Sequence, residues 1–182
     1  MTHKHSNRSG LTIVEVMIAM AILGVMFLAI SRSLMGSVKL NEVTRESALA
    51  QQGMDAVLES LGGADFASTF QRYNSVASDD PATGPSPGPD FVVPGLQPLP
   101  EDADGRVGRI VLPEVMTPEG LELREDLDIP ELGMPRDLNG DGGIDDVDHA
   151  TDYKVLPVLL QLDWRGQSGH RQTVARTILA RR

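Results

Sequence analysis

Residues 137–148, DLNGDGGIDDVD, carry side chains whose types and spacing could do chemistry. Side chains with oxygen atoms alternate around a glycine turn, so one short segment could surround a hard cation. Five acids in these twelve residues repel one another without an ion, and binding would therefore order the loop. The candidate donors are the side chains of Asp137, Asn139, Asp141, Asp145 and Asp148 and the backbone carbonyl of Gly143.

The same twelve residues resemble the calcium loop of EF-hands and dockerins, with Gly142 at the sharp turn. Asp148 takes the last position, where a bidentate glutamate is usual, and the flanking segments lack the paired helices of an EF-hand. We expect a structural calcium ion that holds the loop leading into the last strands. The alternative is an acidic, glycine-rich surface turn that binds nothing specific.

A second chemical group, Glu15, lies inside an apolar run from Leu11 to Ile30. A carboxylate in hydrocarbon costs roughly a few kcal/mol, and about 20 apolar residues are enough to cross a bilayer. Lys4 and Arg8 precede the run, so the short head is expected to stay cytoplasmic while the C-terminal bulk crosses the membrane.

This junction resembles the processing site of type IV pilins and of the pseudopilins of type II secretion. A basic leader ends in Gly10, and Glu15 is the fifth residue after it. The resemblance implies that prepilin peptidase cuts after Gly10 and methylates Leu11, although Phe or Met is more usual there. It also implies that Glu15 pairs with the freed amine of a neighbouring subunit and sets the register of a filament. The alternative is an ordinary signal anchor whose Glu15 reaches water at the interface.

The elements that must position these groups are a long helix and a sheet. Apolar positions continue at helical spacing beyond the span, and Gly62–Gly63 is a reasonable stop. We predict an α+β fold, as in pilins: a long N-terminal helix, membrane-spanning in its first half, packed against a small antiparallel β-sheet. The expected segments are a leader (1–10), a transmembrane half (11–30), a soluble half (31–62), a Pro/Gly-rich variable region (63–106) and a sheet head (107–182).

Strands are expected near the C-terminus. Alternating apolar residues from Leu156 to Trp164 predict a strand with one buried face, in which Trp164 serves packing. The turn residues RGQSGH and the strand-like RQTVARTILA follow, which predicts an antiparallel hairpin. An earlier strand is plausible over 107–115, limited by Pro113.

Composition narrows the function classes. The chain has 182 residues and no cysteine, which excludes disulfides and thiolate chemistry, and its net charge of −10 argues against nucleic acid as a partner. No catalytic constellation is apparent, so we expect no enzyme. His149 follows the acidic loop, and we expect it to be a solvated loop histidine.

The resemblance at the N-terminal junction implies a structural minor pilin or pseudopilin, assembled into a type IV pilus or a type II secretion pseudopilus. The resemblance implies that its partners are other pilin subunits, prepilin peptidase, the inner-membrane assembly platform and membrane lipid. The expected location is the bacterial inner membrane, with a single span and a periplasmic C-terminal domain, and a filament after assembly. The alternative is an uncleaved, membrane-anchored extracytoplasmic binding module with a calcium-stabilised head.

Overall fold

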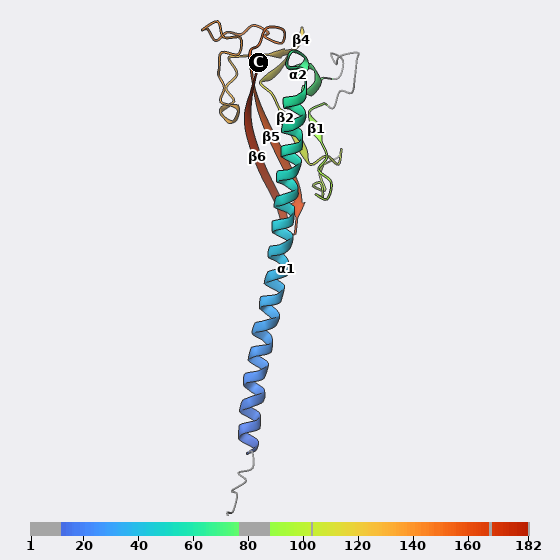
Figure 1. The fold of residues 1–182 in the computed structure, drawn as a ribbon, viewed down its shortest axis with the longest axis vertical. Helices are drawn as coiled ribbons and strands as arrows, with labels where there is room; N and C mark the ends of the chain where they lie inside the picture. Colours follow the sequence, from blue (N-terminus) through green and yellow to red (C-terminus); the bar gives the residue numbers. More distant parts are fainter. Residues whose placement is uncertain (1–11, 77–87, 103, 168, 182) are drawn as a thin grey trace, which may run out of the picture. The chain divides into compact units, whose positions relative to one another are not determined.

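A computed structural model describes residues 12–76, 88–102, 104–167 and 169–181 (Figure 1). The chain forms two compact units, Met1–Glu42 and Val43–Arg182. The predicted α+β class is confirmed, because one long N-terminal helix is combined with small antiparallel sheets.

Helix α1 (Ile13–Gly63) ends at the predicted pair of glycines. From residue 12 to residue 41 every side chain is exposed except Ser31, which is half-buried. In the second unit the helix turns one stripe inward, because its buried residues recur mainly at intervals of four. These residues are Glu46, Ala50, Met54 and Leu61.

The main sheet has four antiparallel strands in the order β1-β2-β5-β6. Within the second unit, the C-terminal part of α1 runs along this sheet (Figure 1) and contributes to the same hydrophobic core. The expected C-terminal hairpin is confirmed as β5 and β6, which pair over their full length. The strands are β1 (Asp90–Phe91), β2 (Gly108–Val111), β5 (Val155–Gly166) and β6 (Gly169–Ala180).

Strand β5 forms the centre of the core. Its alternating residues Leu156, Val158, Leu160, Leu162 and Trp164 are all buried, as predicted. Pro157 and Leu159 on the other face are buried too, so the first half of β5 is covered on both sides. The short 3-10 helix η2 (Pro130–Leu132) contacts β5, which the alternation alone did not indicate.

Helix α2 (Phe66–Tyr73) and strand β4 (Gly120–Leu123) have no counterpart in the sequence-based expectations. Helix α2 packs the ring of Phe66 at 4.8 Å from that of Tyr153. Strands β3 (Glu114–Thr117) and β4 form a separate two-stranded sheet. The predicted strand over 107–115 is therefore divided between two sheets, because Pro113 lacks the N–H that a continuing ladder requires.

Candidate functional site

The acidic loop 137–148 is fastened at both ends. At its start, the Leu138 carbonyl accepts hydrogen bonds from the N–H groups of Lys154 (2.8 Å) and Val155 (3.1 Å), at the beginning of β5. At its end, Asp148 Oδ1 accepts from the N–H of Leu123 (2.9 Å), the last residue of β4. The N–H of His149 donates to the Leu123 carbonyl at 2.9 Å. The loop therefore joins β4 to the start of the final hairpin.

Inside the loop, backbone N–H groups point at the side chains in the first half. Asp137 Oδ2 accepts from Gly142 N (2.9 Å), and Asn139 Oδ1 accepts from Asp141 N (2.9 Å). Gly142 has a φ of 91°, which favours glycine and allows the turn. These bonds hold the oxygen-bearing side chains of Asp137, Asn139 and Asp141 around one tight turn. The carboxylates of Asp145 and Asp148 instead contact His149 and the Leu123 N–H.

Asp141 illustrates the electrostatics of this turn. Its Oδ1 accepts a hydrogen bond from Gly143 N at 2.7 Å, and its Oδ2 lies 3.1 Å from Asn139 Nδ2. The bond from the Gly143 N–H, followed by that from Asn139, lowers the pKa of Asp141 below its ordinary value. The carboxylate is therefore kept ionised, as a cation ligand must be.

The second half of the loop turns toward His149. Asp145 Oδ1 lies 3.1 Å from His149 Nε2, and Glu125 Oε1 lies 3.8 Å from the same nitrogen. On the other side of the ring, Nδ1 lies 3.0 Å from Asp152 Oδ1 and 3.4 Å from Asn139 Nδ2. Three carboxylates thus surround one imidazole.

The expectation that His149 is solvated was wrong, because the residue is only 3% exposed. Burial lowers the pKa of His149, but hydrogen bonds that the ring donates to Asp145 and Asp152, together with the charge of Glu125, outweigh it, and the pKa is raised. The ring can be buried because acceptors lie at both of its nitrogens. The pKa of Asp145 is lowered, first by the Val147 N–H and then by His149.

Among the residues that the structure describes, one set of three acidic or histidine side chains has ligand atoms all within 4.8 Å of one another. This set is Glu125, Asp145 and His149, so it takes one predicted loop ligand and two residues outside the loop. Glu125 is 1% exposed, and its Oε1 accepts from the N–H groups of Leu138 and Asn139. The sequence offered no signal for Glu125, because it precedes the loop in an unremarkable acidic stretch.

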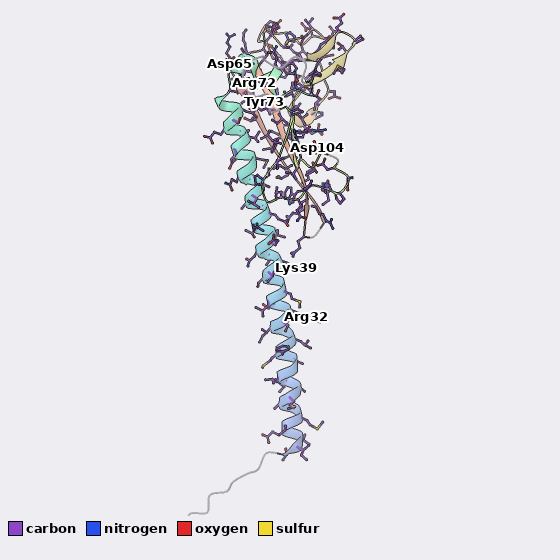
Figure 2. All side chains as sticks on the ribbon, turned by 90° about the vertical axis from the view of Figure 1, so that its right-hand side faces the viewer. Arg32, Lys39, Asp65, Arg72, Tyr73 and Asp104 are labelled. Carbon is purple, nitrogen blue, oxygen red and sulfur yellow. The ribbon has the colours of Figure 1, made fainter. Side chains whose placement is uncertain are left out.

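At the other end of the chain, Glu15 lies in the first turn of α1, and its N–H donates to Thr12 Oγ1 at 3.3 Å. Gly10 and Leu11, the predicted processing residues, lie outside the described residues. One helix of the described chain, α1, is long and apolar enough to cross a membrane. Arg32 and Lys39, labelled in Figure 2, follow the apolar stretch on the same helix.

Comparisons with known proteins bear on the N-terminal segment. A family model described as "Prokaryotic N-terminal methylation motif" matches residues 5–31. Searches of curated proteins and of solved structures found no significant match. The matched segment includes Gly10, Leu11 and Glu15, and the motif is the hallmark of prepilin-type signals. The chain therefore carries the N-terminal methylation motif of type IV pilins and pseudopilins.

Proposed function

We propose that this chain is a structural minor pilin or pseudopilin subunit that joins a type IV pilus or a type II secretion pseudopilus. The observation that carries the proposal is the methylation motif over residues 5–31, which supports a pilin-like protein processed by prepilin peptidase. The exposed apolar surface of α1 is consistent with this role. Such a surface requires lipid before assembly and other subunits afterwards.

The role of Glu15 follows from charge. Cleavage after Gly10 would create an amine at Leu11, four residues before Glu15. A carboxylate and an amine that are each costly in an apolar setting offset one another when neighbouring subunits align them. Glu15 thereby sets the register between subunits, and the chain performs no catalysis of its own.

The first experiment tests processing. The full chain is made with an active or an inactivated prepilin peptidase, and its mass is measured. We expect loss of residues 1–10 and addition of one methyl group only with the active peptidase, and no cleavage of a Gly10→Val variant. An intact Met1 with the active enzyme would instead support the uncleaved, anchored binding module.

The second experiment tests assembly, using two glutamates of the same helix. Glu15→Ala is expected to be cleaved normally but lost from sheared filaments. Glu59→Ala, a change at an exposed position in the second unit, is expected to assemble like the parent chain. Equal incorporation of both variants would contradict the registering role.

We further propose that loop 137–148 binds a structural calcium ion. The first-half donors are Asp137, Asn139 and Asp141, which the backbone already orders around Gly142. The Gly143 carbonyl, Asp145 and Asp148 are the remaining candidates from the loop pattern. Because the loop links β4 to β5, the ion would stabilise the entry to the final hairpin.

The calcium proposal predicts a change in thermal stability. At about 100 times Kd, a ligand that binds only the folded state stabilises it by about 2.7 kcal/mol. Melting of the full chain in detergent micelles, with calcium or with a chelator, measures this effect. Asp141→Asn should reduce the calcium-dependent shift, and Asp146→Asn, outside the predicted ligand set, should not. An unchanged midpoint in the parent chain would rule out a structural ion.

The proposed partners follow from the same assignment. They are prepilin peptidase, other pilin or pseudopilin subunits, the inner-membrane assembly platform and membrane lipid. The motif and the apolar helix support a membrane-anchored protein. We place the anchor in the bacterial inner membrane and the C-terminal unit in the periplasm, because Lys4 and Arg8 precede the span.

A further inference from the structure

We propose that Glu125, Asp145 and His149 form a second cation site, for a divalent transition metal ion of the zinc class. It lies beside the hard-cation turn around Asp137, Asn139 and Asp141 and takes Asp145, which the loop pattern alone would assign to calcium. The two sites share the loop but differ in donors, since an imidazole nitrogen suits zinc-class ions and oxygen donors suit calcium. The proposal goes beyond the role of the chain as a filament subunit.

The geometry of the three donors carries the inference. Their ligand atoms lie within 4.8 Å of one another, which is close enough for one ion to contact all three. The side chains of His149 and Glu125 are 4% and 1% exposed, so both are fixed by their surroundings. Asp145 is 48% exposed and leaves the site open to an incoming ion.

His149 is oriented as a metal ligand would be. Its Nδ1 lies 3.0 Å from Asp152 Oδ1, and an ionised carboxylate only accepts hydrogen bonds. A proton on Nδ1 therefore serves Asp152 and directs Nε2 at Asp145 and Glu125. Metal-binding histidines commonly use a carboxylate at the second nitrogen in this way.

Charge provides an independent reason for a cation at this point. Nε2 faces Asp145 Oδ1 at 3.1 Å and Glu125 Oε1 at 3.8 Å, and both carboxylates are acceptors. A positive group between these atoms would compensate the negative charge of the Glu125 carboxylate, which is 1% exposed, whereas Asp145 is 48% exposed and reaches water. A proton on Nε2 makes a hydrogen bond to Asp145 at 3.1 Å, whereas Glu125 Oε1, at 3.8 Å, is too far away to accept one. A divalent ion that replaces the proton would serve all three donors and leave a position for water.

The expected consequence of ion binding is that three segments of the chain are held together. Glu125 follows β4, Asp145 belongs to the loop, and His149 immediately precedes the turn into β5. An ion bound to all three would join these segments at one point. It would thus stabilise the packing of the two-stranded sheet against the start of the final hairpin.

The test is a calorimetric titration of the full chain with Zn²⁺, in detergent micelles and without calcium, because Asp145 is also a candidate calcium ligand. His3 and His5 are replaced by Gln in every sample, because the leader could itself bind zinc. We expect one Zn²⁺ per chain. Binding should persist in two matched controls. Asp146→Asn removes the acid next to Asp145, and His170→Gln removes a histidine outside the site.

The ligand variants decide the outcome. Asp145→Asn and His149→Gln should each weaken Zn²⁺ binding by more than the about 10- to 100-fold expected on loss of an outer partner. Asp152→Asn should weaken it within that range, and Asp152→Glu should restore it. Absence of Zn²⁺ binding by the parent, or equal affinity in Asp145→Asn and Asp146→Asn, would overturn the proposal.

A folding defect cannot mimic this pattern. Asp145 is half-exposed, so its amide variant should keep the circular dichroism and the melting temperature of the metal-free parent even if His149→Gln does not fold. Asp145→Asn then decides the matter alone. Zn²⁺ binding is also measured without prepilin peptidase, so that failure of the filament assignment and failure of this site are separate results.

Discussion

Residues 13–41 and residues 43–63 belong to one helix, yet their side chains meet different surroundings. In the first segment large apolar side chains such as Leu23 (70% exposed) face outward on all sides. In the second, Ala50, Met54 and Leu61 are buried in the core of the C-terminal unit. The first segment therefore needs an apolar environment outside the chain, whereas the second finds its own. One continuous helix thus has a segment that requires apolar surroundings outside the chain and a segment that packs in the core of its own unit.

The largest expected effect lies in the core of the second unit. Leu160→Ala removes a fully buried side chain of β5 and should lower the free energy of unfolding by about 2–5 kcal/mol. Leu23→Ala removes the same atoms from the exposed segment and should leave unfolding of the second unit unchanged. Calorimetric melting of both variants in detergent would test the difference, and equal destabilisation would break the comparison.

Substitution by arginine should have different effects at exposed apolar residues of the proposed span and at exposed apolar residues of the second unit. Leu23→Arg places a cation in the proposed span, and on insertion scales this raises the free energy of membrane insertion by about 2.5–3.5 kcal/mol. Met116, which is 62% exposed on β3, should accept arginine within about 0.5 kcal/mol, as surface positions do. Resistance to alkaline extraction from membranes measures insertion. Loss of insertion is expected for Leu23→Arg, and its retention would argue that the segment does not lie in lipid.

The charged residues of the helix offer a smaller contrast. Glu46 is 8% exposed; its Oε1 accepts from Gln167 N at 3.1 Å, and its Oε2 lies 3.6 Å from Arg171 Nη1. Glu46→Ala should destabilise the unit by about 1–3 kcal/mol, because a part-buried hydrogen bond from the Gln167 N–H to a charged carboxylate is lost. Glu59→Ala, at an exposed position, is the matched control. Urea unfolding followed by Trp164 fluorescence reports both, and equal midpoints would contradict the role of Glu46.

Two glycines of α1 are expected to give effects of opposite signs, and the effect at Gly36 is the smallest of all. A Cβ on Gly53 would lie 2.5 Å from Val93 Cγ2, whereas a Cβ on Gly36 meets nothing within 4 Å. Gly53→Ala should therefore destabilise by about 1–3 kcal/mol through overpacking. Gly36→Ala should stabilise the helix by about 0.5–1 kcal/mol. Helicity and melting by circular dichroism test the pair, and stabilisation by both would show that Val93 yields to the added methyl group.

Much of the fold could be predicted from local pattern. The apolar run and the paired glycines predicted α1, and the alternation from Leu156 to Trp164 predicted the final hairpin. These signals are local, since periodicity and turn chemistry depend on residues near one another in the chain. Helix α2 could have been found from its apolar positions Phe66, Phe70 and Tyr73, which recur at helical spacing inside a segment that reads otherwise as loop.

The candidate functional residues also fall into a group that local sequence predicted and a group that it did not. The methylation motif and the acidic loop are each one continuous stretch of sequence. The sequence by itself therefore determined that Gly10 and Glu15 belong to a processing motif and that residues 137–148 form a loop rich in oxygen donors. Only the tertiary structure decided that Asp145 turns to His149, that Glu125 joins them, and that His149 is buried. The physical reason is that a local pattern specifies which donors are neighbours along the backbone. Glu125 and His149 are 24 residues apart in the chain. Whether two such distant donors come into contact depends on how β4, the loop and β5 pack together.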